Sequence, residues 1–357
     1  MENFNIKYFL AANSCEGFVS SFTDNYDAKD GWRAYIIKGG PGTGKSSFMK
    51  YIAVKSAEKN LKCELCPCSS DPDSLDAVIL PQKKIIIMDG TAPHTVDPVY
   101  PAVCEQILNF GNFWKTENIS KENDAIIDTT DKNKSLHRSA SRYLKACGCI
   151  IHENYKTAFK FTDTEKTYDY ALKLCKKNIP QKYGKGKEWI RYLCGITPKG
   201  VVSYAKTVTE TCKKVIIISD KNASVSNIIM NTARDFAMNR GYEIITVKNA
   251  FLPSLITDHI IIPELSLAFV RESEFQHFSS DNRRIRAERF IDTDKLAKHR
   301  EKMKFNKKVI RELLLTASAL LREAKSVHDK LEKYYIDAMD FPALTAFATE
   351  FADKILK

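Results

Sequence analysis

The chain has 357 residues, of which 44% are apolar and 10% aromatic, and its 55 Lys and Arg against 44 Asp and Glu give a formal charge of +11. This composition excludes a disordered, fibrous or low-complexity chain, and the length predicts two domains of ordinary size. The longest apolar runs, such as Ile85–Met88 and Ile260–Ile262, are far shorter than the roughly 20 residues of a membrane-spanning helix. No membrane partner is therefore expected.

The ten cysteines are scattered along the chain, and residues 1–9 show no signal-peptide pattern. Cys63 and Cys66 have the spacing of a metal-binding pair, but no second pair accompanies them, so a buried strand is favoured over a zinc site. Reduced thiols are the simplest interpretation, and the predicted location is cytoplasmic.

The positive charge is distributed unevenly along the chain. Residues 1–113 have a net charge of −2, residues 114–190 of +6, and residues 191–357 of +7. Basic stretches such as Lys132–Arg142 and Lys182–Lys187 would suit a nucleic-acid backbone or another acidic surface. A solvated helix face is the favoured interpretation, because charge runs usually mean no more than that. Nucleic acid remains an alternative partner that is not favoured.

The strongest local motif is GxxxxGK[S/T], at Gly39–Ser46. The apolar run Tyr35–Ile37 predicts a strand before it, and the apolar spacing within Ser46–Lys59 predicts a helix after it. In such a loop, backbone amides and the positive end of the helix surround a phosphate. The residues predicted to bind nucleotide are Gly39, Gly40, Pro41, Gly42, Thr43, Gly44, Lys45, Ser46 and Ser47.

The expected cofactors are ATP and Mg²⁺. Lys45 would contact the β- and γ-phosphate oxygens, and the Ser46 hydroxyl would ligate magnesium together with Asp89, which follows the apolar run Ile85–Met88. The predicted catalytic residues are Lys45, Asp89 and His94.

The segment after Asp89 lacks the glutamate that many hydrolysing P-loop enzymes use to orient water. His94 and Asp97 are the nearest substitutes. A second polar cluster follows the strand expected at Cys63–Cys66, and it consists of Asp71, Asp73 and Asp76. Each of these residues also suits a turn without chemistry.

The chain contains an internal repeat at an offset near 180 residues. Gly17–Ser20 resembles Gly200–Ser203, and Tyr35–Ile37 resembles Val215–Ile217. In this register Val225 takes the place of Lys45 and Arg271 takes the place of Asp89. A loop without glycine cannot surround a polyphosphate well, so one competent nucleotide site is expected, in the first half.

The repeat predicts two domains. Residues 1–185 would form a P-loop domain with a helical insertion at about 114–180, and residues 186–357 would form a degenerate domain with a long helical hairpin. Apolar residues in steps of three and four, among them Ala317, Ala324 and Leu331, predict a heptad-like apolar seam along the second long helix. Leu136, Tyr143 and Ile150 begin the matching helix of the first copy. Intramolecular packing of these helices is favoured, and a protein partner or homodimer arm is the alternative.

Three segments carry a resemblance to a family: Ile36–Ser46, Asp71–Asp76 and Ile86–His94. Together they resemble an uncharacterised family of bacterial tandem P-loop NTPases (ATPase-like), with a duplicated core and a degenerate second P-loop. The resemblance covers nearly the full length. It implies a P-loop NTPase fold and ATP binding through the glycines of the loop, Lys45, Ser46 and Asp89. With the internal repeat, the expected fold class is α/β, with two tandem P-loop NTPase-like (RecA/kinase-type) three-layer units, each with a long helical excursion.

The predicted function is a magnesium-dependent ATPase with one nucleotide site and a regulatory or structural second half. The second half could complete the site with an arginine from the cluster Arg283, Arg284, Arg286 and Arg289. A small-molecule kinase is the first alternative, with Asp89 or His94 near an acceptor hydroxyl. A helicase-like ATPase stimulated by nucleic acid is the second, and nucleotide binding without turnover is the third.

Overall fold

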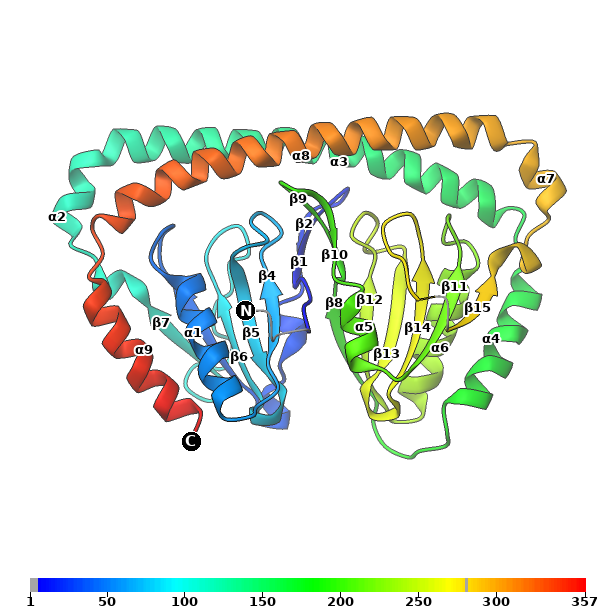
Figure 1. The fold of residues 1–357 in the computed structure, drawn as a ribbon, viewed down its shortest axis with the longest axis horizontal. Helices are drawn as coiled ribbons and strands as arrows, with labels where there is room; N and C mark the ends of the chain where they lie inside the picture. Colours follow the sequence, from blue (N-terminus) through cyan, green and yellow to red (C-terminus); the bar gives the residue numbers. More distant parts are fainter. Residues whose placement is uncertain (1–5, 280–281) are drawn as a thin grey trace. The chain divides into compact units, whose positions relative to one another are not determined.

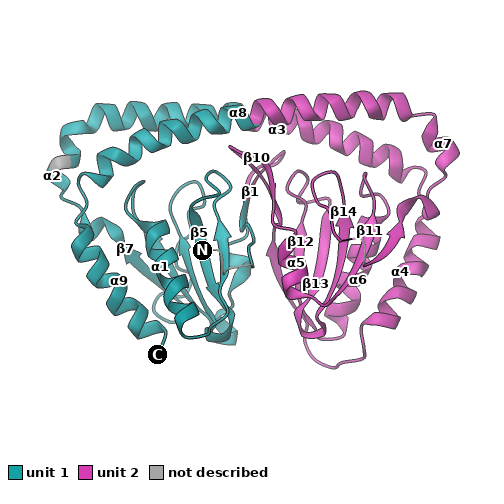
Figure 2. Cartoon of the chain, viewed as in Figure 1, with its two compact units in different colours: residues 1–11, 20–140, 318–357 teal, residues 12–19, 141–317 magenta. Residues whose placement is uncertain are grey.

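A computed structural model describes residues 6–279 and 282–357, so the first five residues considered for an export signal lie outside it. The protein is a mixed α/β protein, 48% helical and 24% strand. It divides into two compact units, coloured separately in Figure 2. Unit 1 comprises residues 1–11, 20–140 and 318–357, and unit 2 comprises residues 12–19 and 141–317. These units are not contiguous in sequence and differ from a division at residue 185.

The sheet of unit 1 has five strands in the order β4-β5-β6-β3-β7. The strands are β3 (Arg33–Lys38), β4 (Glu64–Pro67), β5 (Leu75–Leu80), β6 (Ile85–Asp89) and β7 (Glu105–Asn109). β3 is parallel to both of its neighbours, β6 and β7, whereas β4 and β5 are antiparallel to the strands beside them. The carboxyl ends of β3 and β6 therefore lie side by side at one edge of the sheet.

Two helices that are far apart in sequence cover one face of this sheet, α1 (Lys45–Glu58) and α9 (Phe341–Ile355). Tyr35 and Ile37 of β3 point to this face, because alternate residues of a strand share a face. Phe351 of α9 meets Tyr35 edge to face, at 4.8 Å between ring centroids, and also contacts Phe48 of α1. The end of the chain thus completes the core around the first strands.

The sheet of unit 2 has six strands in the order β15-β11-β14-β13-β12-β8. They are β8 (Lys187–Arg191), β11 (Lys214–Ser219), β12 (Glu243–Lys248), β13 (Thr257–Ile262), β14 (Leu267–Glu272) and β15 (Arg283–Arg286). Helices α4 (Thr164–Asn178) and α6 (Ser226–Asn239) pack together in its core. The short helix α5 (Lys206–Thr211) follows two hairpin strands, β9 (Cys194–Thr197) and β10 (Gly200–Ser203). A similar hairpin is formed by β1 (Ala11–Ser14) and β2 (Gly17–Ser20).

Two long helices, α3 (Asn123–Phe159) and α8 (Arg300–Ile336), follow the short helices α2 (Thr116–Ile119) and α7 (Thr293–Ala297). α3 begins in unit 1 and ends in unit 2, and α8 runs from unit 2 into unit 1. The two helices are paired antiparallel. In unit 1 the Asn133 side chain donates a hydrogen bond to the Ala324 carbonyl, and in unit 2 Asn306 donates to the Asn154 side chain.

The predicted long helices are confirmed, with one correction to the buried face of α3. In α8, Ala317, Ala324 and Leu331 of the predicted apolar seam are buried. In α3, Tyr143 was placed on the buried face and is 40% exposed, whereas its neighbour Leu144 is buried. The prediction was wrong at this position because the buried face runs through Ala140, Leu144 and Cys147, in steps of four and three.

Each unit contains a helix contributed by the other half of the sequence. α4 follows α3 and packs against α6 in unit 2, whereas α9 follows α8 and packs against α1 in unit 1. The same backbone bridge recurs in both units, Trp114 with Met339 and Thr162 with Ile291. The long helices therefore exchange their C-terminal segments between the two cores (Figure 1).

The order of elements in unit 1 recurs in unit 2. β3 and β11 begin at residues 33 and 214, and α1 and α6 begin at residues 45 and 226, an offset of 181 in both cases. β6 and β14 are offset by 182, and α3 and α8 by 177. These offsets define equivalent residues in the two units. Among the described residues, no helix is long and apolar enough to cross a membrane.

Candidate functional site

The glycine-rich loop, residues 39–46, connects the end of β3 to the start of α1 in unit 1. Gly42 and Gly44 have φ of +68° and +80°, in the left-handed region that favours glycine. The ammonium of Lys45 donates to the carbonyl oxygens of Gly39, at 3.2 Å, and Gly40, at 2.6 Å. It also lies 3.6 Å from Oδ2 of Asp89. The loop thus brings its lysine to the carboxylate at the end of the neighbouring strand.

Asp89 ends β6 directly beside Ile37 of β3. Its Oδ1 accepts hydrogen bonds from the backbone N–H of Thr91, at 2.9 Å, and from the Thr91 hydroxyl, at 2.6 Å. Only 14% of the Asp89 side chain is exposed, and 12% of the Lys45 side chain. Thr91 fixes one carboxylate oxygen, while the other faces the lysine and the start of α1.

The Ser46 hydroxyl accepts the backbone N–H of Leu75 at 2.9 Å, which ties α1 to β5. A hydroxyl oxygen has two lone pairs, so one remains for a cation. Magnesium in phosphate sites is held by one or two protein oxygens and the phosphates, and Ser46 and Asp89 supply oxygens of this kind. Among residues 6–279 and 282–357, no group of three or more His, Cys, Asp or Glu side chains is arranged to hold a metal ion.

Asp76, on β5, has a buried carboxyl. Burial raises its pKa, the charge of His94 opposes that shift, and Asp89 and Lys45 also act on it. His94 is 7% exposed, stacks on Phe22 with ring centroids 4.9 Å apart, and has Nε2 3.9 Å from Oδ1 of Asp76. Of the residues predicted to be catalytic, His94 therefore lies beside Asp76, and the charges of Lys45 and Asp89 affect the pKa of Asp76. The sequence had grouped Asp76 with Asp71 and Asp73 in a second polar cluster.

The other acidic residues considered for catalysis have structural contacts. Asp97 forms an ion pair with Lys38, at 2.7 Å, and its side chain is 74% exposed. Asp71 accepts the backbone N–H of Asp73, at 3.2 Å, and the hydroxyl of Ser74, at 3.0 Å. Asp71 and Asp73 therefore belong to a turn, as the alternative interpretation of the sequence had it.

Helices α8 and α9 pack directly against the glycine-rich loop. A Cβ atom on Gly42 would lie 2.6 Å from the Glu332 carbonyl oxygen, and one on Gly40 would lie 2.9 Å from the Tyr335 ring. A Cβ atom on Gly44 would lie 3.0 Å from Leu344. The absence of side chains at these positions allows the helices to approach the loop backbone.

Polar side chains of α8 form ion pairs near its contact with the glycine-rich loop. The Glu332 carboxylate lies 3.5 Å from His328, and Lys325 lies 3.3 Å from Asp71 and 2.8 Å from Asp329. His328 lowers the pKa of Glu332, and the backbone N–H of Gly42 and the Lys325 charge lower it further, while partial burial opposes them. Sequence analysis missed these residues. Their spacing could have identified them in the sequence, since residues 325, 328 and 332 share one face of a helix.

The equivalent loop of unit 2 differs from its predicted register by one residue. Because α1 begins at Lys45 and α6 at Ser226, Ser226 takes the position of Lys45, and Val225 takes that of Gly44. The error arose from an offset of 180 where the structure has 181. The carboxylate of Asp220 accepts the backbone N–H groups of Val225 and Ser226, both at 2.8 Å, so an internal anion occupies these amides.

The arginine cluster considered for completing the nucleotide site lies in β15 and the turn after it, within unit 2. Arg284 pairs with Glu272, and Arg283 donates to the Tyr170 hydroxyl at 3.3 Å. Arg289 lies over the Tyr170 ring, 5.5 Å from its centroid. These three arginines therefore contact their own unit.

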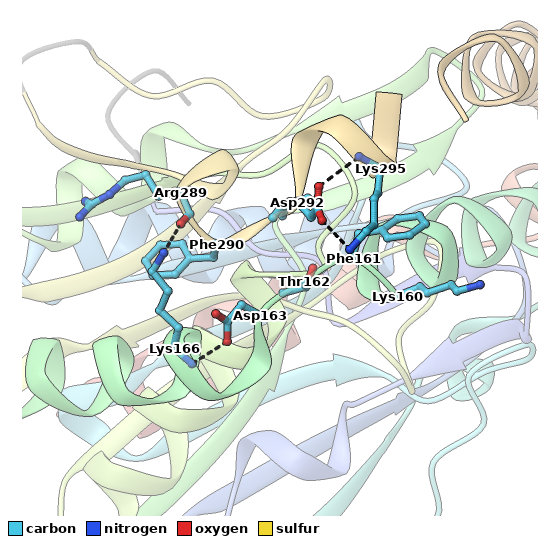
Figure 3. Close-up of a pocket in the computed structure, with 10 residues that line it drawn as sticks. Lys160, Phe161, Thr162, Asp163, Lys166, Arg289, Phe290, Asp292 and Lys295 are labelled. Carbon is cyan, nitrogen blue, oxygen red and sulfur yellow. Dashed lines mark hydrogen bonds and ion pairs between the residues drawn. The ribbon is translucent and has the colours of Figure 1, made fainter. Parts of the chain in front are cut away.

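Unit 2 has a pocket of about 380 Å³, formed by the turn between α3 and α4 and the segment before α7. Figure 3 shows the residues that line it. Lys160, Lys166, Arg289 and Lys295 contribute positive charge to it. Lys295 pairs with Asp292 at 2.9 Å, and Lys166 donates to the Arg289 carbonyl. Asp163 and Asp292 cap the helices that follow them. These contacts stabilise helix ends, and we assign no ligand to the pocket.

No protein-family model, curated protein or solved structure matches this chain significantly. The function must therefore be inferred from its own residues.

Proposed function

We propose that the protein is a magnesium-dependent ATPase of the tandem P-loop type, with one nucleotide site, in unit 1. One observation carries the proposal: the glycine-rich loop joins a buried parallel strand to a helix, and its Lys45 lies 3.6 Å from the carboxylate that ends the adjacent strand. A glycine-rich turn alone would not require a lysine and an aspartate that are both largely buried at this place.

Unit 2 has a structural or regulatory role in this proposal. Its loop lacks the lysine, its amides are engaged by Asp220, and Arg271 stands where unit 1 has Asp89. A polyphosphate would meet the Asp220 carboxylate instead of free amides. We therefore expect one nucleotide for each chain.

The decisive experiment is calorimetry with MgATP and MgGTP, followed by phosphate release, on the wild type and on Lys45→Ala. The variant should lose at least about a hundredfold in nucleotide affinity, nearly 3 kcal/mol. Lys55→Ala, which removes an exposed lysine of the same helix, is the control and should bind normally. Equal affinity of wild type and Lys45→Ala would contradict the site assignment.

A small-molecule kinase is the second candidate, and the buried Asp76 favours it. A carboxyl whose pKa is raised by burial is suited to accept a proton from an acceptor hydroxyl. The test is ADP formation with and without a pool of metabolites. ADP that forms only with an acceptor would favour the kinase, and ADP that forms at the same rate without one would favour the ATPase.

A further inference from the structure

The last turns of α8 lie against the part of the glycine-rich loop that would receive phosphates. The Glu332 carbonyl oxygen would be 2.6 Å from a Cβ atom on Gly42, and Ile336 would be 3.0 Å from it. The Tyr335 ring covers Gly40 and lies 5.7 Å from the Trp114 ring. The contact is therefore a packed one, formed by side chains and backbone together.

The side chain of Glu332 places a negative charge at this contact. The Glu332 carboxylate lies 3.5 Å from the His328 ring, and its pKa is lowered by His328 and, less strongly, by the Gly42 N–H. Backbone amides of such a loop are the groups that bind phosphate oxygens. A carboxylate beside this loop therefore opposes the binding of phosphate there.

Unit 2 offers an internal comparison for this arrangement. The positions equivalent to Lys325, His328, Glu332 and Tyr335 are occupied in α3 by Gly148, Ile151, Tyr155 and Ala158, none of which is charged. In unit 2 the loop amides are instead taken by Asp220, a residue of the loop itself. Both loops thus have a carboxylate near their amides, but only in unit 1 does it come from a long helix.

We infer that the last turns of α8 are an internal competitor for nucleotide: the Tyr335 ring and the Glu332 backbone cover Gly40 and Gly42, and a polyphosphate must displace them to bind the glycine-rich loop. This inference rests on the proposed function. The end of α8 and a polyphosphate cannot occupy the same side of the loop glycines, and the Glu332 charge repels phosphates, so nucleotide binding moves residues 325–336 away from the loop. The ion pair of Lys325 with Asp71 holds the helix in the competing position.

The test compares the wild type with Glu332→Gln, which keeps the shape of the side chain and removes its charge. Affinities for MgATP, pyrophosphate and adenosine are measured by calorimetry. The variant should bind MgATP and pyrophosphate about tenfold more tightly, and adenosine equally. Glu323→Gln, at an exposed position of the same helix, is the matched control and should equal the wild type.

Unchanged or weaker MgATP binding by Glu332→Gln, with binding abolished in Lys45→Ala, would overturn the inference and leave the proposed function intact. An equal gain for adenosine would also overturn it, since adenosine has no phosphates. Failure of both wild type and Glu332→Gln to bind MgATP would overturn both proposals. A second measurement needs no variant: hydrogen exchange of residues 325–336 should accelerate when MgATP is added to the wild type, and unchanged or slower exchange would count against displacement.

Discussion

The guanidinium of Arg271 lies 2.6 Å from the carboxylate of Asp258 in the interior of unit 2. These residues are equivalent to Asp89 and Asp76 of unit 1, because β13 and β14 are offset by 182 residues from β5 and β6. Unit 2 thus has an arginine at the position of Asp89, and this arginine pairs with the carboxylate at the position of Asp76. Unit 2 has a closed ion pair where unit 1 has two acidic groups beside a lysine.

Replacing Arg271 with Met should destabilise unit 2 by about 3–5 kcal/mol, because it leaves the buried Asp258 carboxylate without its charged partner. The free energy of unfolding, measured with urea, reports the loss. The double variant Arg271→Met, Asp258→Leu should recover much of it, since neither charge of the buried pair remains. Equal destabilisation of the single and double variants would show that the ion pair is not the cause.

Asp220→Ala should lower stability by about 1–2 kcal/mol without creating a second nucleotide site. The carboxylate satisfies the N–H groups of Val225 and Ser226 at the start of α6, and a lost cap of this kind has that magnitude. Calorimetry should give one nucleotide per chain for both proteins. Asp235→Ala, which removes an exposed carboxylate of α6, is the control. Two nucleotides per variant chain would contradict the assignment of unit 2.

Gly42→Ala should displace α8 from the glycine-rich loop, because the new Cβ atom would meet the Glu332 carbonyl at 2.6 Å. Gly31→Ala is the matched control, since Gly31 has a similar φ of +75° and open space around it. The free energy of unfolding of the control should fall only by the roughly 1–2 kcal/mol that alanine costs in a left-handed backbone conformation. Ala223, the residue of unit 2 equivalent to Gly42, has a φ of +63°, so the conformation alone tolerates alanine. Equal melting temperatures of the two variants would contradict the packing argument.

Phe351→Ala should destabilise unit 1 by about 3–5 kcal/mol, the usual effect of removing a buried phenylalanine. Hydrogen exchange can locate the effect. Protection should fall in α1 and β3, whose Phe48 and Tyr35 contact the ring, and should persist in α6. Loss of hydrogen-exchange protection in α6, with protection retained in α1, would contradict the packing of α9 in unit 1.

His259 should make stability depend on pH. Its ring accepts the Arg271 N–H and contacts Gln276, and burial lowers its pKa from 6.5 to about 4. The unfolded chain therefore takes up a proton near pH 6.5 that the folded protein accepts only near pH 4. The free energy of unfolding should fall by about 3 kcal/mol as pH decreases through this window, and this contribution should be constant below it.

The measurement for His259 is urea unfolding at a series of pH values. His259→Gln should remove this part of the slope, and His277→Gln, at an exposed position, is the control. An unchanged slope in His259→Gln would assign the pH dependence to other groups.

The α/β class, the strand, loop and helix around the glycine-rich loop, the aspartate at the end of β6 and the two long helices could all be predicted from the sequence. Each depends on local patterns: apolar runs, glycine spacing, and steps of three and four residues. The same patterns placed Tyr143 on the wrong face of α3 and shifted the second loop by one residue. Periodicity and similarity fix positions only to within a residue or so.

The residues that surround the loop were decided by the tertiary structure alone. Glu332 is 290 residues from Gly42 in sequence, and no local pattern indicates that α8 and α9 return to the first core. α4 and α9 join cores in which most elements recur in the same order, so the local sequence does not indicate which core each helix joins. The sequence by itself determined which residues could bind a phosphate. Packing over long chain separations determined which helix covers that site, since burial is set by the whole fold and not by neighbouring residues.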